Sequence, residues 1–180
     1  IMSTVHDLFI WNRAIKDHKL ISKESTDLAF TNYTTKDGKH IDYGYGWALG
    51  DIKGSKIIQH GGGIFGYTTM GIWMPDEDVF VAVFSNRDDM APGGVALKIA
   101  ALAIGKPVPK PNPDIKIDEK YAQKVVGLYE FEDEAVRYIT YEDGQLYSQR
   151  KGSVAFKIFP TDENTFIYES SLSTIRFIIS

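Results

Sequence analysis

The feature that most restricts the fold of this chain is a proline-rich segment near its middle. In the run Gly105-Lys-Pro-Val-Pro-Lys-Pro-Asn-Pro113, four of the chain's seven prolines fall within seven positions. Proline lacks a backbone N–H and fixes φ, so this segment can form neither a helix interior nor a central strand. We expect an extended spacer of about 20 Å. It predicts a domain over residues 1–105, a linker over 106–117 and a small module over 118–180.

The first of these domains combines helical and strand patterns. Thr4 and Asp7 form a capping-box pattern that begins a helix through about residue 18, and Ser22 begins a shorter helix through Leu28. Pro92 at the start and Gly105 at the end favour a third, apolar helix. Alternating runs bounded by glycine predict strands between these helices, at 43–49, 56–60, 67–74 and 79–85. Because the intervals leave no room for crossover helices, we expect an antiparallel sheet flanked by helices, which is an α+β fold.

The second domain has the pattern of a small all-β module. Asp118 begins a short helix through Val126. Alternating runs separated by turn residues then predict strands at 127–131, 135–141, 145–149, 154–159, 165–170 and 174–179. The last run has no closing turn or partner after it, which favours an open sheet or an incomplete barrel over a closed one.

Composition disfavours several classes of function. With 20 Lys and Arg against 24 Asp and Glu, the net charge is -4, so nothing argues for nucleic acid as a partner. The chain has no cysteine, and His6, His18 and His40 lack an i+4 partner, so we expect no metal site.

The longest apolar run, 95–104, is too short to span a bilayer. Helical sequence follows residue 1 without a leader pattern, which leaves open that the chain is a piece of a longer protein.

The densest cluster of candidate functional residues is the run Gln59-His-Gly-Gly-Gly-Ile-Phe-Gly-Tyr67. Three consecutive glycines at the end of a strand remove every side chain from one stretch of backbone. A ligand can then lie against the strand edge and pair with its N–H and C=O groups. A glycine-rich hairpin with a surface histidine beside it is the structural alternative, and the residues alone leave both interpretations open.

One glycine pattern in this cluster matches a cofactor motif in the wrong context. Gly61, Gly63 and Gly66 satisfy G-x-G-x-x-G, and Asp88 lies downstream at about the spacing of a dinucleotide fingerprint. Such a site needs a helix that opens at the glycines, whereas the sequence from Tyr67 onward is β-type. We therefore expect no dinucleotide site.

A nucleophile motif in the second domain is disfavoured for a similar reason. Ser148 and Lys151 satisfy S-x-x-K, in which the lysine must lie one helical turn after the serine. Here the two residues straddle the end of a strand and the turn at Gly152, which directs their side chains to opposite sides. We expect Ser148 to play no catalytic role.

Five short motifs follow one another in the first domain, and their order is informative. They are Tyr43-Gly-Tyr-Gly-Trp47, Ile58-Gln-His-Gly-Gly-Gly63, Phe65-Gly-Tyr67, Gly71-Ile-Trp-Met-Pro75 and Val81-Ala-Val-Phe-Ser-Asn86. This order resembles the C-terminal part of the penicillin-recognising serine hydrolases. More narrowly, it is similar to the class C β-lactamase-like group of D-amino-acid peptidases, carboxypeptidases and esterases. The resemblance covers about residues 1–105 and implies the C-terminal portion of a β-lactamase/transpeptidase-like domain.

The second domain carries a separate resemblance. Its motifs Gly127-Leu-Tyr129, Gly144-Gln-Leu-Tyr147 and Phe159-Pro160 are similar to the small lipocalin-like module that is often appended to such hydrolases. The similarity covers about residues 118–180. That module usually continues through another strand or two, so the resemblance implies an incomplete copy here.

The resemblance to the hydrolases implies roles for the glycine cluster. It aligns His60-Gly61-Gly62 with the Lys-Thr-Gly triad on one wall of the active-site cleft, where substrate binds. Gly63 matches the residue whose backbone N–H completes the oxyanion hole. Histidine in place of the lysine weakens the clamp for a substrate carboxylate, because an imidazole is mostly neutral at pH 7. We therefore expect a peptidase or esterase rather than a dedicated β-lactamase, with a small-molecule or peptide substrate and no cofactor.

The reactive half of such a site is missing from this sequence. In the family, an S-x-x-K serine attacks the carbonyl, and its lysine or a Y-x-N tyrosine takes the proton, both upstream of the region matched here. Neither Y-x-N nor S-x-N occurs in this chain, so it supplies no nucleophile and no general base. We interpret the chain as a C-terminal fragment, inactive alone, whose partner is the N-terminal part of the same protein. The resemblance implies a periplasmic or cell-surface location in bacteria.

A non-catalytic module that binds a peptide or a small ligand is the alternative function. It is motivated by the missing nucleophile and by tyrosines that could line a groove in the second domain: Tyr129, Tyr138, Tyr141, Tyr147 and Tyr168. Alternation along a sheet with two faces explains these tyrosines equally well.

Overall fold

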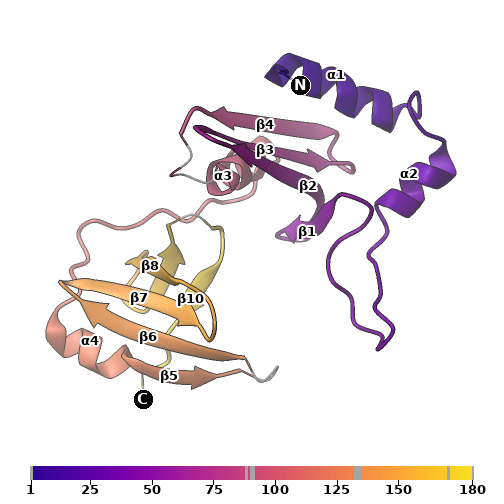
Figure 1. Ribbon diagram of the computed structural model, residues 1–180. Helices are drawn as coiled ribbons and strands as arrows, with labels where there is room; N and C mark the ends of the chain where they lie inside the picture. Colours follow the sequence, from indigo (N-terminus) through magenta and orange to yellow (C-terminus); the bar gives the residue numbers. More distant parts are fainter. Residues whose placement is uncertain (1, 88, 90–91, 132–134, 170, 180) are drawn as a thin grey trace. The chain divides into compact units, whose positions relative to one another are not determined.

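The chain divides into two compact units, Ile1–Pro107 and Val108–Ser180, in a computed structural model (Figure 1). The structure describes residues 2–87, 89, 92–131, 135–169 and 171–179. Asp88, the acidic residue of the disfavoured dinucleotide pattern, and Ser170, the end of one predicted strand, lie outside these residues. Among the residues that are described, no helix is long and apolar enough to cross a membrane.

The first unit is built on an antiparallel sheet with the strand order β1-β2-β3-β4. Two helices precede the sheet and one follows it, as the sequence predicts. The elements are α1 Val5–Lys16, α2 Lys23–Ala29, β1 Ala48–Ile52, β2 Ser55–Ile64, β3 Tyr67–Met74, β4 Val79–Ser85 and α3 Gly93–Ala103. Thr4 caps α1 through the expected capping box, in which its hydroxyl accepts from the backbone N–H of Asp7.

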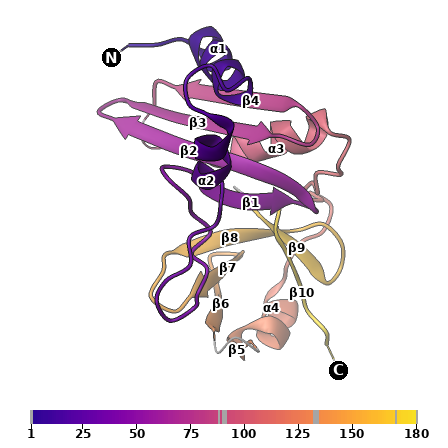
Figure 2. The same ribbon diagram turned by 90° about the vertical axis from the view of Figure 1, so that its right-hand side faces the viewer.

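Helices α1 and α3 cover opposite faces of this sheet (Figure 2). On one face, Gly93 of α3 lies so close to Met70 that a Cβ there would be 3.1 Å from the methionine methyl carbon. On the other face, the ring of Phe30 makes edge-to-face contacts with Trp73 and with Trp47. Trp47 in turn stacks on Trp11 of α1, with ring centroids 5.5 Å apart. The core of the unit therefore lies on both sides of β3, as alternation along a central strand requires.

The boundaries of the first two strands differ from those that the sequence predicts. The run 43–49 was expected to be a strand, but β1 begins at Ala48, and Tyr43 makes only an isolated bridge to Ala48. Asp42 and Gly46 have φ of 53° and 78°, and such left-handed residues interrupt an extended run. Strand β2 is longer than the predicted 56–60, because pairing with β3 carries it through the glycines to Ile64.

The second unit is an open, curled antiparallel sheet with one short helix. Its strand order is β10-β9-β8-β7-β6-β5, and within the described residues β5 and β10 do not pair with each other. Helix α4 contributes Ala122 and Val125 to a core with Phe166 and Phe177. The α+β fold class is thus confirmed. The elements are α4 Glu119–Val125, β5 Gly127–Glu130, β6 Val136–Glu142, β7 Gln145–Arg150, β8 Ala155–Pro160, β9 Thr165–Tyr168 and β10 Thr174–Arg176.

The proline-rich segment leads into the second unit and is tied to it at two points. The backbone N–H of Asn112 donates to the Pro160 carbonyl at 2.7 Å. The Tyr141 hydroxyl donates to the Ile117 carbonyl at 3.1 Å. The later residues of the segment are therefore held in place by strands β6 and β8.

Candidate functional site

The candidate site lies where β2 extends past its neighbour β1. The pairing of these two strands ends with Gln59 opposite Ala48. From His60 to Ile64, β2 pairs with β3 alone in the described part of the chain. One edge of this glycine segment therefore has no strand partner, which is the arrangement that lets an extended ligand add to a sheet.

The three glycines of this segment differ in the room that a side chain would have. A Cβ at Gly62 would lie 2.9 Å from the Thr69 hydroxyl oxygen, and one at Gly61 would lie 3.3 Å from the Thr69 carbonyl oxygen. At Gly63 nothing would come closer than 3.8 Å. Close packing against β3 thus explains the first two glycines, whereas no contact within the unit requires the third. The missing side chain at Gly63 leaves its surroundings open.

His60 is exposed and is held by two hydrogen bonds. Its Nε2 lies 2.8 Å from the Tyr43 hydroxyl, and its Nδ1 lies 2.6 Å from the Gly61 carbonyl oxygen. The rings of Tyr43 and His60 meet edge to face, with centroids 6.0 Å apart. No group of His, Asp or Glu in the described residues could hold a metal ion. Hydrogen bonds to Tyr43 and Gly61 therefore orient the imidazole.

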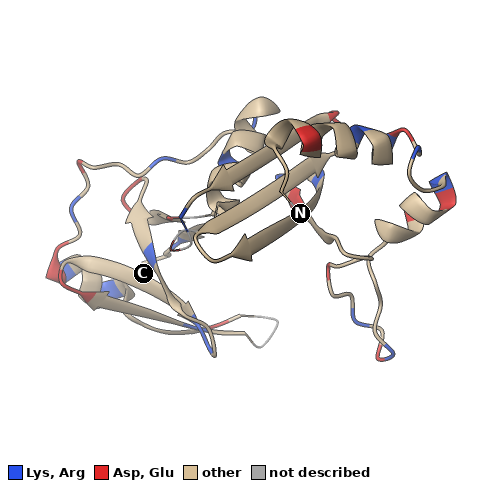
Figure 3. Cartoon of the chain, turned by 45° about the horizontal axis from the view of Figure 1, so that its top comes forward, with Lys and Arg blue, Asp and Glu red and all other residues tan. Residues whose placement is uncertain are grey.

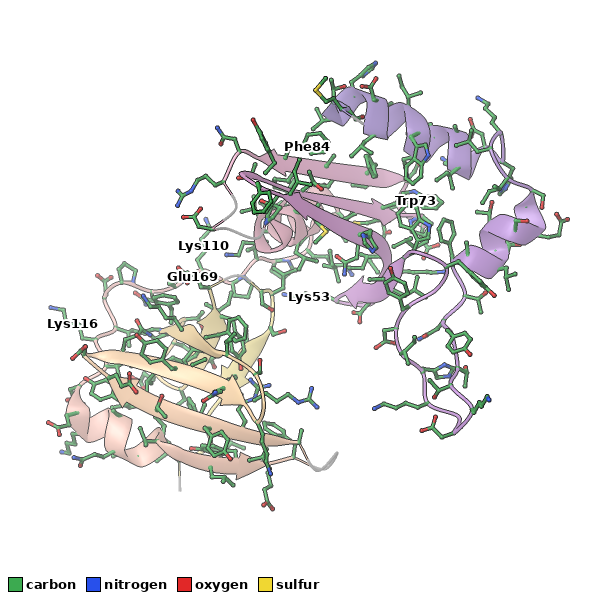
Figure 4. The ribbon with its side chains drawn as sticks, in the orientation of Figure 1. Lys53, Trp73, Phe84, Lys110, Lys116 and Glu169 are labelled. Carbon is green, nitrogen blue, oxygen red and sulfur yellow. The ribbon has the colours of Figure 1, made fainter. Side chains whose placement is uncertain are left out.

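A groove of about 880 Å³ opens on the sheet face beside Gly62 and Gly63. Tyr67 and Phe84 line it, the latter labelled on β4 in Figure 4. Strands β3 and β4 and the 60–64 segment carry no Lys, Arg, Asp or Glu, and Figure 3 shows the charged residues on other elements. These elements therefore offer backbone groups, aromatic rings and the His60 imidazole, but no charged side chain of their own.

Comparison with known proteins decides which family this arrangement represents. Residues 1–106 match the Beta-lactamase family. The chain belongs to the beta-lactamase family. It is 30% identical to Penicillin-binding protein 4* of Bacillus subtilis (strain 168) over 187 residues, which cover 99% of this chain and 42% of that protein. The resemblance of residues 1–105 to this family is thus confirmed at the level of the beta-lactamase family.

A solved structure shares the fold of this chain. The octameric penicillin-binding protein homologue from Pyrococcus abyssi matches with a TM-score of 0.54 and 23% identity. The match covers 92% of this chain and 40% of that one. This beta-lactamase family chain therefore spans about two fifths of the length of the relatives that it matches.

The two disfavoured motifs have ordinary structural roles in this beta-lactamase family chain. Gly61 and Gly63 lie within β2, and Gly66 lies in the turn to β3 with φ of 78°, so no helix follows the glycines. Ser148 is fully buried on β7, and its hydroxyl lies 3.0 Å from Arg137 Nη1 and 2.9 Å from the Tyr168 hydroxyl. These hydrogen bonds hold the Ser148 hydroxyl in the interior of the second unit, where it is inaccessible to a substrate.

The remaining histidines lie away from the glycine segment. His18 follows α1 with φ of 55°, and its Nδ1 is 3.2 Å from the Thr26 hydroxyl. His40 bonds the Thr34 hydroxyl in the loop before β1, and His6 is exposed on α1. The residue that sequence reasoning missed is Tyr43, which was used only as part of a motif. Nothing in its spacing from His60 signals their contact.

Proposed function

We propose that this chain supplies one wall of the acyl-transfer site of a serine hydrolase that acts on amide or ester substrates. The observation that carries the proposal is the unpartnered edge of β2 from His60 to Gly63. The chain's membership of the beta-lactamase family supports it. The name of the Bacillus subtilis relative, a penicillin-binding protein, is consistent with a carbonyl substrate and with a location in the cell envelope.

Each residue of the segment has a proposed role. The serine oxygen of the missing half attacks the substrate carbonyl carbon, and the electron pair of the C=O bond moves onto the carbonyl oxygen. The Gly63 N–H donates to that oxyanion, a contribution worth about two to three powers of ten in rate in comparable sites. Gly61 and Gly62 form the part of β2 along which the substrate backbone binds: Gly61 faces the open edge, and Gly62 pairs with Thr69 of β3 and leaves the surface free of a side chain. His60 is the polar side chain of the wall. The leaving amine or alcohol takes its proton from the general acid of the missing half.

The nucleophile and the general base come, in this proposal, from a part of the protein that precedes residue 1. The sequence contains no Y-x-N, and its S-x-x-K serine is buried in hydrogen bonds to Arg137 and Tyr168. An oxyanion donor without a nucleophile performs no acyl transfer. The 180-residue chain alone is therefore inactive.

The second unit is proposed to be a lipocalin-like module joined through a linker at residues 106–117. The family match ends at residue 106 and the compact units divide after Pro107, which supports a boundary close to residue 105. The start of the module at residue 118 rests on the sequence pattern alone. Ligand binding by its tyrosines has less support. The hydroxyls of Tyr129 and Tyr141 donate to the carbonyls of Val125 and Ile117, so they serve the module's own structure.

The test is made on the complete reading frame. We expect an S-x-x-K sequence at the start of a helix and a Y-x-N sequence upstream of residue 1. The purified complete protein should then form an acyl adduct with a slowly hydrolysed ester, seen by intact mass, and replacement of the S-x-x-K serine by alanine should abolish it. The 180-residue chain serves as the control and should form no adduct. A reading frame with neither motif, or a complete protein without an adduct, contradicts the proposal.

A further inference from the structure

The pairing of Tyr43 with His60 has a defined hydrogen-bond polarity. A backbone carbonyl oxygen only accepts hydrogen bonds, so the Nδ1 that lies 2.6 Å from the Gly61 oxygen must carry a proton. In the neutral imidazole, the other nitrogen then carries the lone pair. The phenolic O–H of Tyr43, 2.8 Å from Nε2, is the donor to that lone pair.

The backbone around Tyr43 holds the phenol in place for this contact. The Tyr43 carbonyl accepts from the backbone N–H of Tyr33 at 2.9 Å, and Gly44 N–H donates to the Trp47 carbonyl at 2.8 Å. Gly44 itself lies against the Ala29 carbonyl, too close for any side chain. The backbone at Tyr43 is therefore fixed from both sides, which limits the positions that its ring can take beside His60.

We infer that Tyr43 is the positioning residue of His60, and that it locks the imidazole in the tautomer with the proton on Nδ1. A histidine side chain in water favours the opposite tautomer, with the proton on Nε2. Both neighbours of this imidazole favour a proton on Nδ1. The Gly61 carbonyl oxygen accepts a hydrogen bond from Nδ1–H, and the Tyr43 hydroxyl donates one to the lone pair of Nε2. The loss of either bond shifts the balance between tautomers.

The lock determines what this wall of the site presents to a substrate, a consequence that rests on the proposed function. In the neutral pair, Nε2 has no proton to give, and the Tyr43 hydrogen is already donated to it. The neutral pair can therefore only accept a hydrogen bond from a substrate, through the Tyr43 hydroxyl oxygen, and it carries no positive charge. No Lys, Arg, Asp or Glu lies on β3, β4 or residues 60–64. The wall thus suits a neutral substrate with a hydrogen-bond donor, such as an amide N–H, and disfavours a free carboxylate.

The experiment measures the tautomer directly in the 180-residue chain labelled with ¹⁵N-histidine. Long-range ¹H–¹⁵N correlation spectra distinguish a protonated ring nitrogen from one with a lone pair. In alkaline buffer, we expect His60 to show the protonated type at Nδ1 and the lone-pair type at Nε2. Replacement of His60 by Gln assigns its signals among the four histidines. A wild-type spectrum with the proton on Nε2 overturns the inference without any variant.

The variant Tyr43→Phe keeps the ring and removes only the hydroxyl. We expect the tautomer ratio to move about fivefold toward Nε2–H, as the loss of one ordinary hydrogen bond allows. Tyr45→Phe is the matched control, because Tyr45 lies on the same loop and is 67% exposed. The control should leave the ratio unchanged, and equal spectra for the two variants would overturn the role of Tyr43.

A second readout does not depend on assigned spectra. Diethyl pyrocarbonate acylates an imidazole nitrogen that has a free lone pair, and peptide mapping reports the modified residue. Tyr43→Phe should increase the modification rate of His60 severalfold, whereas the rates of His6 and His40 should stay unchanged. An unchanged rate at His60 contradicts the inference. Neither readout needs activity, so failure of the acyl-transfer proposal and failure of the tautomer lock are distinguishable.

Discussion

Gly44 lies directly against the carbonyl oxygen of Ala29, at the end of α2. A Cβ at Gly44 would be 2.1 Å from that oxygen and 3.1 Å from the Thr31 carbonyl oxygen. Both neighbours are backbone atoms that cannot rotate away. The contact packs the loop that carries Tyr43 against the end of α2. It therefore helps to hold Tyr43 beside His60 in the candidate site.

The substitution Gly44→Ala should therefore destabilise the first unit. We expect a loss of roughly 3 kcal/mol in the free energy of unfolding, the upper part of the range for overpacking. Gly50→Ala is the matched control, since its Cβ would make only ordinary contact at 3.6 Å with Ile57. That control should change stability by less than about 1 kcal/mol. Urea denaturation of both variants checks the prediction, and equal midpoints would contradict it.

Asp78 joins the β3–β4 turn to α1, and this contact should make stability depend on pH. Its Oδ1 lies 2.7 Å from Lys16 Nζ and 2.7 Å from Arg13 Nη1. Hydrogen bonds from Lys16 and then Arg13 lower the pKa of Asp78 below its usual 3.8. Because the folded pKa is lower than the unfolded one, the stabilisation is present above pH 3.8 and is lost as the pH falls through the folded pKa.

The variant Asp78→Asn should be less stable than the wild type at neutral pH and low salt. Asparagine tolerates the positive φ of 55° at this position, so the charge is the main change. Thermal unfolding should show the difference shrinking below the folded pKa of Asp78 and at high ionic strength. Asp76→Asn is the control, because Asp76 makes no ion pair within the described residues. A difference that persists in acid would show that the ion pairs do not cause it.

How far the sequence predicts this fold depends on the range of the contacts involved. The helix starts at Thr4, Ser22 and Asp118 were predicted correctly, because a cap is a contact between residues about three apart. The start of β1 was predicted wrongly, because alternation reveals neither the left-handed backbone at Gly46 nor the tertiary contact of Gly44 with the end of α2. Local signals therefore fix the elements better than their ends.

The candidate site shows the same division. The glycine run identified the right segment of backbone, since three adjacent residues without side chains are visible in the sequence. It did not show that Gly61 and Gly62 are required by β3, nor that Tyr43, 17 residues before His60, is its hydrogen-bond partner. Both facts depend on strand register and on the path of a loop, which spacing alone does not determine.

In the second unit, Ser148→Ala should be costly although the change is small. The serine hydroxyl is buried and lies within hydrogen-bond distance of Arg137 and Tyr168. Its removal leaves those groups short of a partner, so we expect a loss of about 1–3 kcal/mol in unfolding free energy. Ser153→Ala, on an exposed turn, is the control and should have little effect. Hydrolysis by the complete protein should be unchanged under conditions where both variants are folded. A loss of hydrolysis in Ser148→Ala alone would contradict our expectation that Ser148 is not the nucleophile.

Replacement of His60 by lysine in the complete protein should change substrate preference. A lysine ammonium carries a permanent charge, so binding of substrates with a free carboxylate should strengthen by roughly tenfold. Ester substrates that lack the carboxylate should show no such gain. Steady-state KM values for a matched acid and methyl ester measure the effect. Unchanged values for both substrates would mean that His60 does not face the cleft.

The central claim, that the open edge of β2 stabilises the reacting carbonyl, is tested most directly at Gly63. Gly63→Ala keeps the backbone N–H and meets no close neighbour, whereas Gly63→Pro removes the N–H. The measurement is kcat/KM of both variants in the complete protein, with thermal unfolding to confirm that each is folded. We predict that the alanine variant stays within a few fold of the wild type and that the proline variant loses about two to three powers of ten. Equal activity of folded alanine and proline variants would contradict the account.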